Sequence, residues 1–97
     1  MTVSISTHVL DTARGEPAPN VRVELAQERV VVASGETDAD GRIRELAHDL
    51  EPGRYELVFW PPSPFFTKVE VQIELSDGHY HIPLLVSPYG CATYRGS

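Results

Sequence analysis

Four histidines are the residues of this sequence whose chemistry operates near neutral pH: His8, His48, His79 and His81. The ordinary pKa of a histidine is about 6.5, so its imidazole can accept or donate a proton near pH 7. His79 and His81 are separated by one residue, which on a strand places both rings on the same face. The pair suits general acid or base catalysis, and its nitrogens also suit zinc, copper or nickel.

A metal site on this pair lacks a third ligand close by in the sequence. His8 would complete the set only if its strand lay beside the strand of the pair. No acidic residue near the pair would orient a ring. We therefore expect no metal ion, and exposed histidines on a strand are the simpler interpretation.

Arginine, tyrosine and serine side chains add groups that bind anions. Arg42 follows Asp40 and Gly41, so a turn would hold its guanidinium at the start of a strand. The chain ends on a phenol, a guanidinium and a hydroxyl, in the sequence Tyr94, Arg95, Gly96, Ser97. Surface arginines and chain ends are more often without function. Together with the histidines, these residues are suited to holding a small anion and moving protons around it.

Composition limits the classes of partner. The chain has 97 residues, 41% of them hydrophobic, which is enough for one small core, so we expect a single domain over residues 1–97. The net charge of -6 has the wrong sign for binding nucleic acid or an anionic membrane. With one cysteine and no long apolar run, we expect a soluble protein of the reducing cytoplasm.

Nucleophilic catalysis finds little support. Cys91 has no base nearby in the sequence, and no serine lies in a Gly-x-Ser-x-Gly turn.

Turn signals rich in glycine, proline, asparagine and aspartate recur at short intervals, and the segments between them have the length of strands. Most segments alternate apolar and polar residues, as strands with one buried face do. The pattern predicts an all-β sandwich of about eight strands, at 3–11, 21–27, 30–36, 42–46, 54–60, 67–75, 79–86 and 91–96.

The segment 79–86 has an unusual second face. Alternation assigns four residues to the core, namely Tyr80, Ile82, Leu84 and Val86. The opposite face then carries His79, His81, Pro83 and Leu85. Two histidines and a proline are unusual on a plain solvent face, so we expect this surface to meet a second subunit or a ligand.

Four segments resemble one known family: 6–18 (STHVLDTARGEPA), 37–43 (TDADGRI), 79–90 (HYHIPLLVSPYG) and the ending 94–97 (YRGS). They are similar to the 5-hydroxyisourate hydrolases, the enzymatic branch of the transthyretin-like proteins. The ending is the most specific segment, since transthyretins differ there and lack the histidines. The resemblance implies a transthyretin-like β-sandwich that assembles as a homotetramer, with active sites in the channel between two dimers.

The resemblance also implies a site. Its catalytic residues would be His8, Arg42, His81 and Ser97. Its substrate-binding residues, lining the channel or closing the chain, would be Tyr94, Arg95, Gly96, Pro83 and Leu85. The implied reaction opens the six-membered ring of 5-hydroxyisourate to give 2-oxo-4-hydroxy-4-carboxy-5-ureidoimidazoline, a step of urate breakdown that needs no metal and no cofactor.

The sequence departs from the family in two ways. The short helix usual between the fifth and sixth strands is replaced by the proline-rich segment 61–66, and the hairpin at 27–29 is tight. Cys91 and Ala92 stand where the family usually has tyrosine and serine. Ala92 removes a hydroxyl from the expected channel wall, whereas Cys91 should affect packing alone.

Two other functions are compatible with such a fold. The first is a carrier that uses the same channel for a small ligand without chemistry. The second is a non-catalytic module that meets partners through a sheet edge. Retention of His8, Arg42, His81 and the 94–97 ending favours the enzyme, because a hydrophobic carrier channel would not need them.

Overall fold

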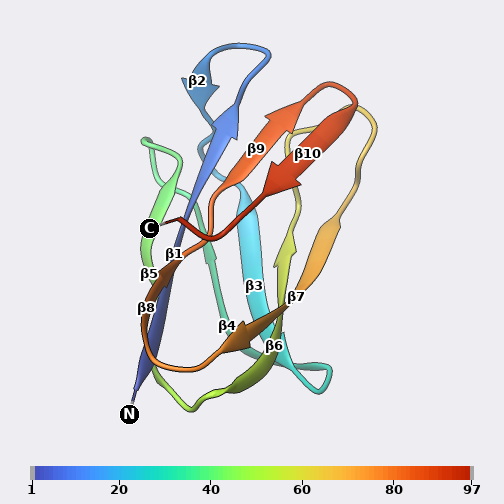
Figure 1. The fold of residues 1–97 in the computed structure, drawn as a ribbon. Helices are drawn as coiled ribbons and strands as arrows, with labels where there is room; N and C mark the ends of the chain where they lie inside the picture. The colour runs from blue at the N-terminus through green and yellow to red at the C-terminus, as the bar shows by residue number, and fades with distance from the viewer. Residues whose placement is uncertain (1, 97) are drawn as a thin grey trace.

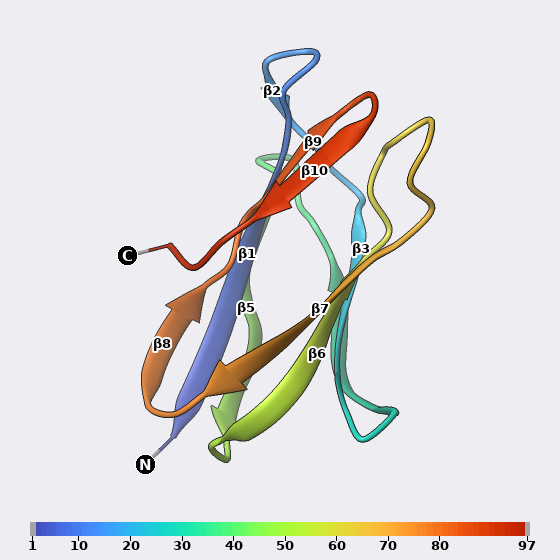
Figure 2. The ribbon, with the colours of Figure 1, turned by 45° about the vertical axis from the view of Figure 1, so that its right-hand side comes forward.

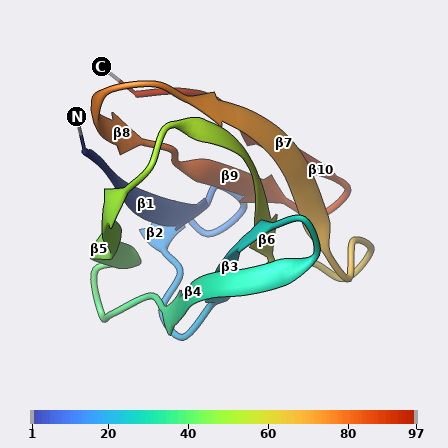
Figure 3. The same cartoon turned by 90° about the horizontal axis from the view of Figure 1, so that it is seen from below.

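The computed structural model describes residues 2–96 and forms two facing β-sheets. The first sheet contains β1 (Val3–Asp11), β2 (Glu16–Pro17), β5 (Arg42–Leu50), β8 (Gly78–His81), β9 (Leu84–Ser87) and β10 (Gly90–Thr93). The second contains, in spatial order, β4 (Val30–Glu36), β3 (Arg22–Gln27), β6 (Gly53–Phe59) and β7 (Val69–Leu75). Seen from below, β3 and β4 lie on one side of the molecule and β1, β8 and β9 on the other (Figure 3).

The core lies between the sheets because each main strand alternates. On β1, Val3, Ile5 and Val9 are buried, and on the second sheet Leu57 and Phe59 are completely buried. Burying an aliphatic or aromatic side chain contributes about 1.5–3 kcal/mol. The predicted all-β sandwich is confirmed, and the inward faces are those that the alternation predicts.

The strand β1 organises the first sheet. It pairs antiparallel with β5 on one side and parallel with β8 and then β9 on the other. Figures 1 and 2 show β1 running between β5 and β8. Residues from the beginning, the middle and the end of the sequence therefore share one sheet face.

The expected strand 79–86 is wrong as a single element. The chain forms β8, leaves the strand at Ile82 and Pro83, and resumes as β9. Proline has no amide hydrogen and cannot donate to the ladder, which explains an interruption at this point. The hydroxyl of Thr7 donates to the carbonyl of Ile82 at 2.6 Å and holds the break against β1.

Other expected boundaries differ more modestly. The strand predicted at 42–46 continues to Leu50, and the strand predicted at 91–96 ends at Thr93. A two-residue strand, β2, was not predicted. Longer pairing explains the first difference, since β5 follows β1 along its whole length through two register shifts.

The connections match the expected trimming. Between β6 and β7 the residues that the structure describes form no helix, and the hydroxyl of Ser63 accepts bonds from the amides of Phe65 and Phe66. The hairpin between β3 and β4 turns through Glu28 and Arg29, both with positive φ, as a two-residue type I′ turn requires. Within residues 2–96, no helix has the length and apolar character to cross a membrane.

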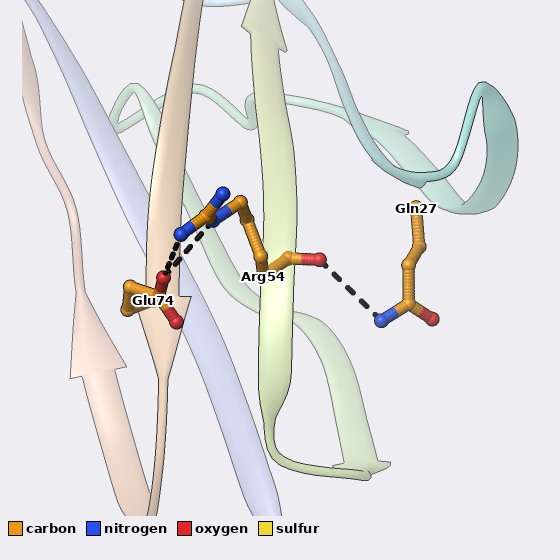
Figure 4. Close-up of polar contacts among 3 residues, drawn as sticks. All are labelled: Gln27, Arg54 and Glu74. Atoms are coloured by element: carbon orange, nitrogen blue, oxygen red, sulfur yellow. Dashed lines mark hydrogen bonds and ion pairs between the residues drawn. The ribbon is translucent and has the colours of Figure 1, made fainter.

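Ion pairs cover the outer face of the second sheet. The guanidinium of Arg54 on β6 donates twice to the carboxylate of Glu74 on β7, at 2.7 and 2.9 Å (Figure 4). The amide of Gln27 approaches the carbonyl of Arg54 at 3.4 Å. Arg22 with Glu24 and Lys68 with Glu70 form two further pairs. Arg22, Arg54 and Lys68 thus each have a carboxylate partner from the same face.

Candidate active site

The register of β1 brings three predicted site residues together. His8 lies directly opposite Arg42 across the antiparallel pair with β5, and Ser6 lies beside His81 across the parallel pair with β8. Residues at even positions of β1 point to the outer face, away from Ile5 and Val9 in the core. A short stretch of three adjacent strands thus carries His8, Arg42 and His81.

A tight turn fixes the backbone of Arg42. The carboxylate of Asp38 accepts bonds from the amides of Asp40 and Arg42 at 2.9 and 3.0 Å. These bonds, that from Arg42 first, lower the pKa of Asp38 below its ordinary value, and the charge of Arg44 adds to the effect. The expected placement of Arg42 at the start of a strand, after a turn, is confirmed.

Gly41 makes this turn possible. Its φ is +73°, and a Cβ there would lie 2.5 Å from the carbonyl oxygen of Val9. The same close approach lets the amide of Val9 donate to the carbonyl of Gly41 at 2.7 Å. A side chain at this position would separate β1 from the start of β5, and with it His8 from Arg42.

The ring of His8 has one assigned proton. Its Nε2 lies 2.9 Å from the main-chain oxygen of Asp40. A carbonyl oxygen only accepts, so Nε2 must carry the hydrogen and donate it. In neutral His8 the Nδ1 atom is therefore the one with a lone pair.

His81 is half-buried and hydrogen-bonded through Nδ1. The hydroxyl of Ser6 lies 2.8 Å from this atom. Burial lowers the pKa of His81 below its ordinary value, and the charges of Arg42, His8 and His79 lower it further. His81 is consequently neutral at pH 7 and able to accept a proton. Among residues 2–96, no hydrogen bond occupies its Nε2 atom.

These groups border a small cavity of about 130 Å³. Its lining consists of Ser6, Thr7, Arg42, Ile43, Arg44 and His81. None of these lining residues is acidic, and neither arginine forms an ion pair within the described residues. The cavity therefore offers positive charge and a neutral imidazole to a small, electron-rich molecule.

The chain end reaches this site through its backbone. The amide of Gly96 donates to the carbonyl of His81 at 2.6 Å, and a Cβ on Gly96 would lie 3.0 Å from the His81 ring. Because Gly96 has no side chain, its backbone can lie against His81. Ser97, predicted to be catalytic, lies outside the described residues.

Within one chain, the side chains of Arg95 and Tyr94 lie away from the cavity at His81. The guanidinium of Arg95 lies over the ring of Tyr80, 4.3 Å from its centroid. Both residues line a different cavity, of about 300 Å³, which runs along β7. A cation over an aromatic face is stabilised electrostatically, which explains the direction that Arg95 takes.

The other two predicted lining residues, Leu85 and Pro83, differ in their burial. Leu85 is half-buried and pairs with the exposed Ala92 of β10, as the alternation predicts. Pro83 is buried instead of exposed, because it lies in the break between β8 and β9, where its carbonyl accepts the hydroxyl of Thr93 at 2.8 Å. Cys91 packs against the core, and burial raises the pKa of its thiol.

Sequence reasoning missed two contributors to the site. Ser6 contacts the rings of both His79 and His81 and is itself 7% exposed. Arg44 lines the cavity two residues after Arg42. The alternation of β1 assigns Ser6 to the correct face, but only the parallel register with β8 reveals its partners. Within residues 2–96, no three potential ligands among His, Cys, Asp and Glu gather as a metal site would require.

The two-sheet sandwich, with His8 of the central strand β1 opposite Arg42 of β5, fits the transthyretin-like class of proteins that the sequence resembles. A family model described as the HIUase/Transthyretin family matches residues 5–96, so the chain belongs to this family.

Individual relatives agree with this assignment. The 5-hydroxyisourate hydrolase of Caulobacter vibrioides is 42% identical over 112 residues, covering 96% of this chain and 97% of the relative. The solved 5-hydroxyisourate hydrolase of Klebsiella pneumoniae superposes with a TM-score of 0.89 and 35% identity, over 98% of this chain and 99% of that one. Sea bream transthyretin in complex with thyroxine has a TM-score of 0.84 and 28% identity, over 95% and 93% of the two chains.

Proposed function

We propose that this protein hydrolyses 5-hydroxyisourate to 2-oxo-4-hydroxy-4-carboxy-5-ureidoimidazoline. The observation that carries the proposal is the cavity that joins neutral His81 to Arg42 and Arg44, neither of which is paired with a carboxylate in the described chain. A neutral imidazole can activate water, and unpaired guanidinium groups can stabilise a developing oxyanion. The relatives named 5-hydroxyisourate hydrolase support the same substrate.

The proposed reaction begins with water. His81, assisted by His8, takes a proton from the water as its oxygen attacks a ring carbonyl of the substrate. Negative charge then develops on the carbonyl oxygen, and Arg42 stabilises it more than it stabilises the uncharged ground state. The carbon–nitrogen bond of the ring breaks, and the departing nitrogen receives a proton. No step requires a metal or a cofactor.

His8 is suited to assist for a geometric reason. Its Nε2–H is held by Asp40, and its strand neighbour across the sheet is Arg42. The Nδ1 lone pair is thus available to orient a water or to accept its proton. We further propose that the tail residues Tyr94, Arg95 and Gly96, with Ser97, position the substrate, which for Arg95 requires leaving its contact with Tyr80.

We propose that the chain works as a homotetramer in the cytoplasm. The cavity of the single chain has a volume of about 130 Å³. Small-molecule sites are typically larger, at about 300–1,000 Å³. A second copy over the outer face of β1, β8 and β9 would enclose the site, with Leu85 and Ala92 at the contact. Light scattering should give four times the 10.7 kDa of one chain. A monomer that is fully active would contradict this assembly.

A carrier of small ligands is the alternative function, since sea bream transthyretin, which has the same fold, is solved in complex with thyroxine. The unpaired Arg42 and Arg44 favour hydrolysis, because a site for a mainly apolar ligand gains nothing from unpaired guanidinium groups.

The experiment follows 5-hydroxyisourate, generated freshly by urate oxidase, through its ultraviolet absorbance. We expect this protein to accelerate its decay, and His81→Ala to lower the rate about 10²-fold or more. The matched control is His48→Ala, since His48 is exposed on β5, outside the residues that line the cavity, and its ring pairs with Glu45 and Asp49. Acceleration that survives His81→Ala would keep the activity and reject the site. No acceleration by the folded protein would favour the carrier.

A further inference from the structure

Two serines of β1 and two histidines of β8 form a continuous chain of hydrogen bonds. The hydroxyl of Ser4 lies 2.7 Å from Nδ1 of His79. The hydroxyl of Ser6 lies 2.8 Å from Nε2 of His79 and 2.8 Å from Nδ1 of His81. The chain begins at an exposed edge of the sheet and ends at the ring that borders the cavity.

The parallel register of the two strands creates this arrangement. Ser4 pairs with His79 and Ser6 with His81, so serines and histidines stand side by side on the outer face. The ring of His81 reaches Ser6, and the ring of His79 spans the gap between the hydroxyls of Ser4 and Ser6. Within residues 2–96, Ser6 is therefore the one side chain that is hydrogen-bonded to both imidazoles.

Hydrogen counting makes Ser6 a coupling point. A serine hydroxyl has one hydrogen, so it can donate to only one of the two rings while it accepts from the other. If Nδ1–H of His81 donates to Ser6, then Ser6 donates to Nε2 of His79, and Nδ1–H of His79 donates to Ser4. In the reverse arrangement every hydrogen points the other way, and His81 carries its hydrogen on Nε2.

We propose that Ser6 couples the tautomers of His79 and His81, so that His81 can take a proton at Nε2 while it releases one from Nδ1. This inference rests on the proposed function, because it concerns the histidine assigned as the base. His79 and Ser6 are positioning residues in this scheme, since they act through His81 and do not touch the substrate.

The proton transfers balance at each atom. When Nε2 of His81 takes a proton from water, its Nδ1 hydrogen passes to Ser6, whose own hydrogen passes to Nε2 of His79. The Nδ1 hydrogen of His79 then passes to Ser4, which releases its own to solvent. Every group returns to its neutral form. When the departing ring nitrogen takes the Nε2 hydrogen of His81, the chain runs backwards and restores the first arrangement.

The surroundings of His81 explain the advantage of staying neutral. Arg42 and Arg44 on β5, His8 on β1 and His79 on β8 all carry or can acquire positive charge near its ring. An imidazolium at His81 would be repelled by these groups and poorly solvated. Moving the proton past the exposed His79 to the partly exposed Ser4 avoids forming that cation beside the substrate.

Nuclear magnetic resonance of 15N-labelled histidines tests the coupling in the resting protein, above the pKa of both rings. We expect His79 and His81 to share the Nδ1–H tautomer in the wild type. Ser6→Ala should move both toward the Nε2–H tautomer that free imidazoles in peptides prefer, and Ser6→Thr should restore the wild-type spectrum. Ser34→Ala, at an exposed serine of β4 in the other sheet, is the matched control and should leave both rings unchanged. Tautomers that do not respond to Ser6→Ala would overturn the proposal.

Turnover provides the second readout. We expect Ser6→Ala to lower kcat at least about tenfold with little change in KM, and Ser6→Thr to recover the rate. A His79→Gln variant should show a solvent isotope effect that depends linearly on deuterium content, whereas the wild type should show the curvature of several moving protons. Equal isotope behaviour in the two would reject the transfer of protons through His79. A wild type without activity would instead reject the proposed function, while the tautomer experiment would still decide the coupling.

Discussion

The outer faces of the two sheets differ in how their arginines are paired. On the second sheet, Arg54 shares the carboxylate of Glu74 at 2.7 Å, in a pair whose side chains are both 68% exposed. On the first sheet, Arg42 and Arg44 border a cavity without an acidic lining residue, and within residues 2–96 neither forms an ion pair. Arg54 is therefore paired on its own sheet, whereas Arg42 and Arg44 remain available for the proposed substrate.

This difference separates stability from function. An exposed ion pair adds little to folding and presents almost no net field to solvent. Burial first, and then the charge of Arg42, disfavour protonation of His81 and lower its pKa. The carboxylate of Asp38 lies near enough for the charges of Arg44 and Arg42 to lower its pKa, but it accepts from the amides of the turn and forms no ion pair with either arginine within residues 2–96. Both guanidinium groups therefore stay available for the proposed substrate.

Arg42→Ala should give the largest contrast between the two faces. We expect kcat/KM for 5-hydroxyisourate to fall about 10²–10³-fold, as it does when a stabiliser of a developing oxyanion is removed. Arg54→Ala removes the same side chain from the other face and should leave turnover within about twofold, since it acts only on an exposed pair. The ultraviolet assay measures both. Similar losses in the two variants would mean that general charge, and not the site, controls the rate.

Gly96→Ala should have the next largest effect. The added Cβ would lie 3.0 Å from the His81 ring and 3.2 Å from its carbonyl oxygen, so the tail must shift. We expect about a tenfold loss of kcat through displacement of the ring or of the residues that follow. Thermal unfolding should change little, because the bridge lies at the edge of the sheet. Full activity would show that the tail is not needed at His81.

Much of the fold follows from local pattern. Alternation on β1 assigns Ile5 and Val9 to the core and His8 to the outer face, as found. The turn of Asp38 and Gly41 has the residue types that its geometry requires. The local pattern is wrong at Pro83, which it assigns to the middle of one strand. Whether a missing amide hydrogen interrupts a strand depends on the neighbouring strand with which it would pair.

The site is less accessible to sequence reasoning because it depends on register. Nothing local indicates that β8 runs parallel to β1, and without that pairing Ser6 has no visible role. The direction of Arg95 depends on its contact with the face of the Tyr80 ring, which lies on another element of the fold. Residues with reactive side chains could be named from their types, whereas the residues that orient them required the structure.

The pH dependence sharpens the comparison further. Because the pKa of His81 is held below its ordinary value of 6.5, the neutral base persists at lower pH, and kcat/KM should decline only below that value. Arg42→Ala removes one cause of the shift, so the acidic limb of its residual activity should move up toward 6.5. Arg54→Ala should not move it. A limb that lies above 6.5 in the wild type would exclude His81 as the group that titrates.

Arg54→Ala should have the smallest effect, on folding instead of turnover. Both side chains of the pair with Glu74 are mostly in water, where solvent screening and lost side-chain entropy offset the attraction. We expect the free energy of unfolding to fall by less than about 1 kcal/mol in urea denaturation at fixed protein concentration. A cycle with Glu74→Ala and the double variant isolates the pair from the packing of the arginine stem. A coupling energy well above that value would show that the charges of the second sheet also contribute to stability. The two sheets would then differ in how their arginines are paired, and not in whether those arginines matter.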